Sequence, residues 1–143
     1  MSKYDCLKIE NQLCFPLYAC AKEIVRKYRP FLSKYDLTYT QYIVMMVLWD
    51  EDKTNVTTLG ERVYLDSGTL TPVLKKLESK GLIIRKRAFM DERNRVLELT
   101  EKGKALQDEV KNVPEEMRKC MALEKGEAET LYKLLYKILG NIE

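Results

Sequence analysis

Apolar residues recur at intervals of three and four positions over most of the chain, which is typical of helices that bury one face. The first set predicts a helix over 11 to 32, in which Pro30 marks a break or kink near the end. Its apolar positions are Leu13, Leu17, Ala21, Ile24, Tyr28 and Phe31. We therefore expect a mainly helical protein.

Capping signals predict where the next helices begin. Thr38 and Gln41 form a Thr-x-x-Gln capping box ahead of an apolar run that stops at the charged residues 50 to 53. The related pattern Thr-x-x-Glu at 58 to 61 predicts a short helix over 58 to 65. Two helices are therefore expected in this part of the chain.

The period of the pattern changes after the next helix. Residues 67 to 80 predict a helix that ends at Gly81, a residue type that suits the position after a helix. Residues 82 to 87 and 95 to 99 are rich in β-branched and long aliphatic side chains and are separated by a polar stretch. This arrangement predicts a β-hairpin with a polar tip.

Helices are expected again after the hairpin. Thr100 precedes a segment of 101 to 113 that ends at Pro114, and from 131 onward the apolar residues share one broad face. The order of helices and hairpin is that of a winged helix-turn-helix, a mainly α fold with a small β-hairpin wing. In such a fold the helix before the hairpin enters the major groove of DNA.

Positive charge is concentrated in the predicted recognition helix and wing. Residues 67 to 95 carry eight basic and three acidic side chains, a net charge of +5, whereas the rest of the chain carries 17 basic and 19 acidic side chains, a net charge of −2. A basic run alone is often only a solvated face, but beside a helix-turn-helix it predicts a phosphate-binding surface. Double-stranded DNA is therefore the expected partner.

Composition excludes several classes of protein. A chain of 143 residues is one ordinary domain, and none of its apolar runs reaches the ~18 residues of a membrane helix. It has no histidine, which removes Ser-His-Asp and Cys-His catalysis and His-based zinc sites. Its four cysteines form no Cys-x-x-Cys pair. We expect a cytoplasmic protein with reduced thiols, no metal, no cofactor and no enzymatic activity.

Three segments resemble the MarR family of dimeric winged-helix repressors. They read LTYTQYIVMMVLW, LGERVYLDSGTLTPVLKKLESKGLI and DERNRVLELTEKG, and the match runs in register over about 11 to 106. The resemblance implies a single MarR-type domain over 1 to 143, with a DNA-binding winged helix at 38 to 99. It also implies that 11 to 35 and 101 to 143 hold the helices of a homodimer.

Within that family, the segment NQLCFPLYACAKEIVRKYRPFL is similar to the organic-hydroperoxide sensors of the OhrR type. This resemblance implies that Cys14 is the reactive cysteine and that the hydroxyls of Tyr18 and Tyr28 hold its thiol, with Tyr39 as a further member of the pocket. It also implies that Cys120 takes the place of a resolving cysteine on the partner subunit.

The neighbours of Cys14 agree with a reactive thiol, although a cysteine among apolar residues is more often packing material. With a helix start near Asn11, Cys14 is at about the third helical position, where free N–H groups and the helix dipole favour a thiolate. Tyr18 lies one turn on and can donate a hydrogen bond to that anion. Cys20 is on another side of the helix and is expected to be packing, and Cys6 is expected in a loose terminus.

The DNA-binding residues are expected on the recognition helix and the wing. Side chains near the start of the helix are predicted to face the major groove, with Pro72 as a local kink, while Arg93 on the wing reaches the minor groove. The residues assigned to DNA binding are Ser67, Thr69, Thr71, Pro72, Lys75, Lys76, Arg87, Asp91, Arg93 and Arg95.

Together these features predict a redox-sensing repressor. A dimer would bind a pseudo-palindromic operator and leave it when an organic hydroperoxide oxidises Cys14, whose sulfenic acid condenses with Cys120 of the partner subunit or with a small thiol. Two alternatives remain. A MarR-type repressor released by a non-covalent phenolic ligand would still respond after Cys14→Ser, and a thiol peroxidase would consume many equivalents of peroxide.

Overall fold

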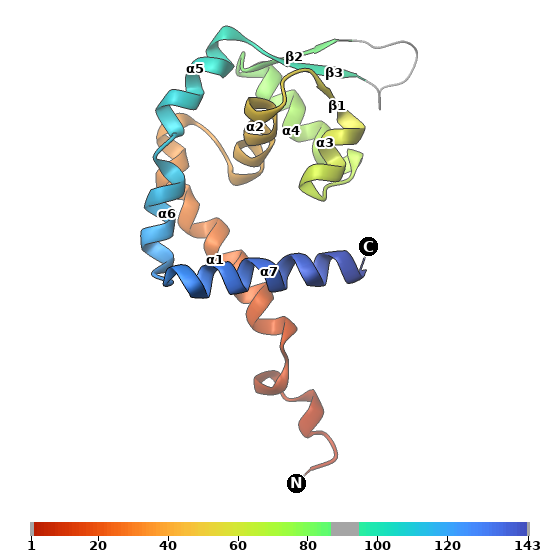
Figure 1. Ribbon diagram of the computed structural model, residues 1–143. Coiled ribbons are helices and arrows are strands. Elements are labelled where there is room, and N and C mark those ends of the chain that lie inside the picture. The colour runs from red at the N-terminus through yellow and green to blue at the C-terminus, as the bar shows by residue number, and fades with distance from the viewer. Residues whose placement is uncertain (1, 87–94, 143) are drawn as a thin grey trace. The chain divides into compact units, whose positions relative to one another are not determined.

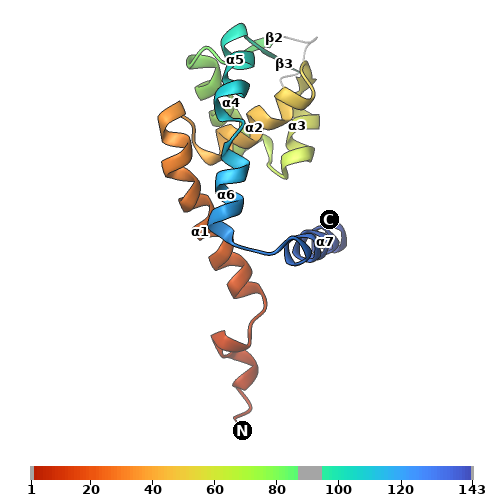
Figure 2. The same ribbon diagram turned by 60° about the vertical axis from the view of Figure 1, so that its left-hand side comes forward.

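The computed structural model describes residues 2–86 and 95–142. The chain divides into two compact units, Met1–Lys111 and Asn112–Glu143. Helices dominate both views of the chain, and the strands form one small antiparallel sheet (Figure 1, Figure 2). The predicted class, mainly α with a small β wing, is confirmed. Within the described ranges, no helix is long and apolar enough to span a membrane.

The first long helix begins later than the sequence predicts. Two 3-10 turns, η1 (Asp5–Leu7) and η2 (Ile9–Asn11), precede α1 (Cys14–Leu32), so the predicted start near residue 11 is wrong. The Gln12 amide donates to the carbonyls of Cys6 and Lys8 at 2.8 and 2.7 Å, and such side-chain bonds compete with helix formation. Cys6 therefore lies in a hydrogen-bonded turn and not in a loose terminus.

Helix α1 continues through Pro30 to its last residue and is followed by η3 (Ser33–Tyr35) and α2 (Tyr39–Asp50). Asp36 adopts the left-handed conformation, with φ 55°, and reverses the chain between the helices. The predicted capping box is confirmed, since Gln41 N–H donates to Thr38 Oγ1 and Thr38 N–H donates to Gln41 Oε1, both at 3.2 Å.

The helix-turn-helix consists of α3 (Val56–Val63) and α4 (Ser67–Ser79). The predicted start of the first helix at 58 is wrong, because Asn55 Oδ1 accepts from Thr58 N–H at 2.7 Å and caps the helix two residues earlier. Helix α4 continues through Pro72, and Gly81, with φ 74°, follows its end as predicted. The two helices thus differ from the prediction only at their ends.

The wing is a three-stranded sheet with the order β1-β3-β2. Strands β2 (Ile83–Lys86) and β3 (Val96–Leu99) pair antiparallel, which confirms the hairpin. The two-residue strand β1 (Thr54–Asn55) pairs with the other edge of β3. It was not predicted, because two residues are too few to show an alternating pattern.

Helices α2, α3 and α4 pack together against the sheet (Figure 1, Figure 2). Trp49 is partly buried at the edge of this core, where its Nε1 donates to the carbonyl of Gly103 at 2.9 Å. The fully buried side chains of this core include Val44, Met45, Leu48, Leu59, Leu70, Leu74, Leu77, Ile83 and Leu97. Burial of one face of α4 leaves its other face to solvent.

Three helices complete the chain. In the first unit, Thr100 caps α5 (Glu101–Val110) by accepting from Gly103 N–H at 3.0 Å. The second unit contains α6 (Val113–Met121) and α7 (Lys125–Ile142). Pro114 was predicted to end a helix, but it lies in the first turn of α6, where its missing N–H costs no helical hydrogen bond. The last helix likewise begins before residue 131.

Candidate redox thiol and nucleic-acid interface

Cys14 is the first residue of α1, and its side chain is exposed. The preceding residue, Leu13, has no polar side-chain atom with which to cap the helix. The first N–H groups of a helix have no acceptor within it, so an anion formed at this end faces the positive end of the helix dipole. Although Cys14 is not at the third helical position as predicted, it remains in the first turn.

A single chain does not enclose this thiol. Tyr18 lies one turn further along α1 and is 63% exposed, with the ammonium of Lys22 5.9 Å from the centre of its ring. Leu13 and Phe15, which flank Cys14, are also exposed. These side chains form an open apolar and aromatic surface around the cysteine.

Three other tyrosines form a cluster between α1 and α2. The ring of Tyr28 lies 4.7 Å from that of Tyr39 and 5.8 Å from that of Tyr42, measured between centroids. Burial raises the pKa of Tyr28 and of Tyr39. Burial, with smaller effects of the other two rings, raises the pKa of Tyr42 to about 12. All three hydroxyls therefore stay protonated and able to donate at neutral pH.

The structure separates the predicted pocket residues within one chain. Tyr28 follows Cys14 by fourteen residues on the same helix, which corresponds to ~21 Å at 1.5 Å per residue. One chain thus brings Tyr18 near Cys14 and places Tyr28 with Tyr39 elsewhere. Tyr42 belongs to this cluster but was not assigned to the thiol pocket, although its spacing of three residues from Tyr39 puts both on one face of α2.

The remaining cysteines are exposed as well. Cys20 was expected to be packing, but it is exposed in the single chain, where α1 buries only Leu32. Cys120 lies in the last turn of α6, in the second unit. Within the described ranges, no group of cysteine and carboxylate side chains could hold a metal ion.

The recognition helix α4 presents polar side chains at its start. Asp66 caps it by accepting from Thr69 N–H at 2.8 Å, and hydrogen bonding from Thr69 holds the pKa of this carboxyl below its usual range. Thr71 donates to the carbonyl of Ser67 at 2.7 Å. The predicted residues on the exposed side of α4 are Ser67, Thr69, Pro72, Lys75 and Lys76, with Thr71 partly buried.

Several basic residues of the predicted patch bind acidic or carbonyl groups of the protein. Arg85 on β2 makes two hydrogen bonds to Glu78 on α4, at 3.2 and 3.0 Å, and Lys86 pairs with Glu98 across the hairpin at 2.7 Å. Arg95 is partly buried just before β3. The other predicted wing residues, Arg87, Asp91 and Arg93, lie outside the described residues.

Comparisons with known proteins give matches over nearly the whole chain. The family described as transcriptional regulator SarA/Rot matches residues 26–110. The organic hydroperoxide resistance transcriptional regulator of Bacillus subtilis (strain 168) is 43% identical over 144 residues, which covers 99% of this chain and 96% of that protein. The chain belongs to the MarR family of winged-helix transcriptional regulators.

Other relatives of this MarR-type regulator include SarZ and AbfR, and AbfR has been solved in several redox states. The regulator SarZ of Staphylococcus saprophyticus is 47% identical over 132 residues, covering 92% of this chain and 90% of that protein. Reduced AbfR bound to DNA has a TM-score of 0.78 and 30% identity, covering 99% of this chain and 98% of that one. AbfR, a protein of Staphylococcus epidermidis, is also similar in its overoxidized, DNA-bound form and in its disulfide form, with TM-scores of 0.79 and 0.65.

Proposed function

We propose that this MarR-type regulator is a repressor that binds a pseudo-palindromic operator as a dimer and is released when an organic hydroperoxide oxidises Cys14. The observation that carries the proposal is the exposed Cys14 at the start of α1, in a chain that matches a hydroperoxide resistance regulator almost end to end. With DNA as its partner, the regulator would act in the cytoplasm.

The chemistry proposed for the thiol balances without a cofactor. The thiolate of Cys14 attacks the peroxide, the O–O bond breaks, and the products are a Cys14 sulfenic acid and an alkoxide, which takes a proton from water to become the alcohol. A second thiol then displaces water from the sulfenic acid and forms a disulfide. Cys120 of the partner subunit or a small thiol would supply this group, and the exposed side chain of Cys120 at the end of α6 suits the first choice.

The pocket around Cys14 requires two chains in this proposal. Since Tyr28 lies ~21 Å along α1 from Cys14, the tyrosine cluster that holds a thiol would come from the partner subunit. Tyr18 would contribute from the same chain as the thiol. The raised pKa values of Tyr28 and Tyr39 support their role, because a neutral hydroxyl donates to a thiolate, whereas a phenolate would repel it.

Helix α7 supports the proposed homodimer. None of its described residues is buried in the single chain. Apolar side chains are exposed along one face, and such a face is typical of a protein interface. These side chains are Leu131, Leu134, Leu135, Ile138 and Ile142, with 37–74% of each exposed. A second copy of the chain is the proposed cover for this face.

Helix α4 is the proposed DNA-reading element. Its buried leucines fix one side against the core, so the exposed polar side chains of the opposite side can meet base edges and phosphates. Ser67, Thr69, Thr71 and Lys75 would face the major groove, and Lys76 would meet the backbone. The wing residues Arg87, Asp91, Arg93 and Arg95 would complete the contact, with Arg93 in the minor groove.

The proposal is tested with a DNA duplex selected from a random pool for binding to the reduced protein. Fluorescence anisotropy measures DNA release, and intact mass measures oxidation, after one equivalent of cumene hydroperoxide. Wild type should gain one oxygen atom or a disulfide and lose DNA. Cys14→Ser should bind DNA and ignore peroxide, while the matched control Cys20→Ser, on the same helix, should respond like wild type.

Two results would favour the alternatives. Release of Cys14→Ser from DNA by peroxide would contradict a redox mechanism at this residue, and release by phenolic compounds would then favour the ligand-binding repressor. Consumption of many equivalents of peroxide per thiol in the presence of dithiothreitol would instead indicate a thiol peroxidase.

A further inference from the structure

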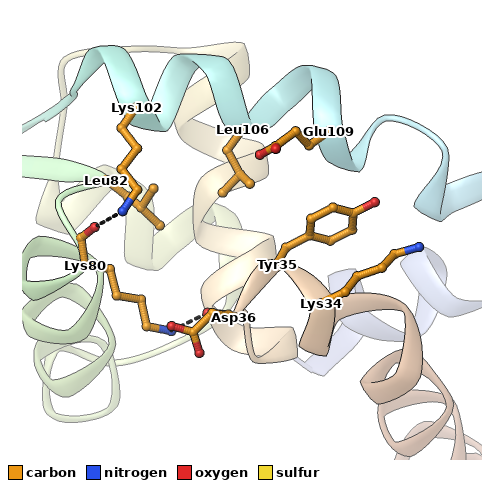
Figure 3. A pocket seen from close by; sticks show the side chains of 8 residues that line it. All are labelled: Lys34, Tyr35, Asp36, Lys80, Leu82, Lys102, Leu106 and Glu109. Atoms are coloured by element: carbon orange, nitrogen blue, oxygen red, sulfur yellow. Dashed lines mark hydrogen bonds and ion pairs between the residues drawn. The ribbon is translucent and has the colours of Figure 1, made fainter.

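Lys80 joins the end of the recognition helix to the junction between α1 and α2 (Figure 3). It is the residue directly after α4, and its ammonium donates to the backbone carbonyl of Asp36 and to Oε1 of Gln41, the latter at 2.7 Å. The carboxylate of Asp36 lies 3.7 Å from the same nitrogen. Two elements that are distant in sequence are thus held by one side chain.

The acceptors of Lys80 are fixed by their own structure. Gln41 is only 5% exposed, and its Oε1 also accepts the N–H of Thr38 in the capping box that starts α2. Asp36 holds the left-handed turn that directs the chain into that helix. Because the Lys80 ammonium is mostly shielded from solvent and its acceptors are held in place, its hydrogen bonds are stronger than those of an exposed surface ion pair. The hydrogen bonds of this ammonium therefore tie the end of α4 to the position of the α1–α2 junction.

A cavity of about 290 Å³ lies beside this junction. It does not have the character of an anion site, because the ammonium groups of Lys80 and Lys102 already bind protein oxygens, Lys102 donating to the Lys80 carbonyl at 2.9 Å. The ammonium of Lys34 lies 5.3 Å from the ring centre of Tyr35 and points away from the other two (Figure 3). The cavity instead leaves space beside Lys80 and its acceptors.

We infer that Lys80 is a positioning residue that couples the cysteine-bearing helix α1 to the recognition helix α4. The inference rests on the proposed function, since it concerns how oxidation reaches DNA binding. Helix α1 carries Cys14 at its first residue and ends at Leu32, shortly before Asp36. A displacement of α1 moves the carbonyl of Asp36, and Lys80 passes that displacement to the end of α4.

The test compares operator affinity before and after oxidation in the full-length dimer. Fluorescence anisotropy gives the dissociation constants of the reduced and the cumene hydroperoxide-treated protein, and their ratio measures the coupling. Couplings between two sites are typically about 5- to 150-fold. We expect Lys80→Met to lower the wild-type ratio by at least about fivefold, and Lys80→Arg, which keeps a cation, to recover part of it.

Lys102→Met is the matched control, because it removes an ammonium from the same cavity without touching the α1–α2 junction. Its ratio should stay within about twofold of wild type. A wild-type ratio in Lys80→Met, or equal losses of affinity in both redox states, would overturn the inference and leave Lys80 a structural role only. A wild type that does not respond to peroxide overturns the proposed function instead. Circular dichroism checks folding, and Lys80→Gln gives the same comparison if the methionine variant does not fold.

Discussion

Gly103 lies where α5 packs tightly against Leu82 and Leu99 at the base of the wing. A Cβ at this position would lie within 3.0 Å of the Leu82 carbonyl oxygen and 3.4 Å from Leu99 Cδ2. The Leu82 carbonyl cannot swing aside, because it is part of the backbone and accepts the N–H of Thr100 at 3.1 Å. Gly103→Ala must therefore push α5 away from the start of β2.

The magnitude follows from three contributions. Alanine favours a helix over glycine by about 1 kcal/mol, which stabilises the variant. Overpacking against backbone costs about 1 to 3 kcal/mol. A shift of α5 also weakens the hydrogen bond from Trp49 Nε1 to the Gly103 carbonyl, which costs about 1 kcal/mol. The net expectation is a loss of about 1 to 3 kcal/mol in the free energy of unfolding.

Urea unfolding measures this loss through the fluorescence of Trp49, the single tryptophan of the chain. All variants are compared at one protein concentration, because the stability of a dimer depends on it. Gly126→Ala is the matched control, since an added Cβ there meets nothing within 4 Å. A Gly103→Ala protein as stable as wild type would refute the assigned clash.

Three further predictions concern titration and assembly. Because the pKa of Tyr42 is raised from 10.0 to about 12, the contribution of this residue to the free energy of unfolding should be complete below pH 10 and should be lost as the pH rises toward 12. In a titration followed by tyrosinate absorbance, Tyr42→Phe should remove the step that occurs at the highest pH. A hydrogen bond from Arg85 lowers the pKa of Glu78, so this pair should stabilise the wing above pH 4.5 and lose that effect as the pH falls through the lowered pKa. When urea unfolding is measured across that pH range, the free energy of unfolding of Glu78→Gln should depend less on pH than that of the wild type. Sedimentation of the wild type at micromolar concentration should show dimers, and a folded monomer would contradict the role given to α7.

Local signals predicted the elements that depend on neighbouring residues. The capping box of Thr38 and Gln41 and the positive φ of Gly81 were predictable, because each requires only a few adjacent residues. The starts of α1 and α3 were not, since a periodic pattern shows neither the side-chain bonds of Gln12 before α1 nor the cap that Asn55 gives α3.

Long-range contacts explain what the sequence could not predict of the site. The density of basic residues in the sequence predicted that Lys80 and Arg85 belong to one DNA-binding patch. In the structure, Lys80 binds the α1–α2 junction and Arg85 binds Glu78. The tyrosines also looked like one pocket in sequence, whereas the length of α1 separates Tyr28 from Cys14.

This separation has a mechanical consequence under the proposed function. If the thiol at the start of α1 meets the tyrosines of the partner, then the tyrosines near the end of α1 receive the partner's thiol, and each helix takes part in both pockets of a dimer. Oxidation of either cysteine would then displace the start of its own α1 and the end of α1 in the partner subunit. Because Lys80 holds the junction that follows α1, the strain would reach α4 from both sites. A repressor built in this way responds as a dimer even when only one of its two thiols has reacted.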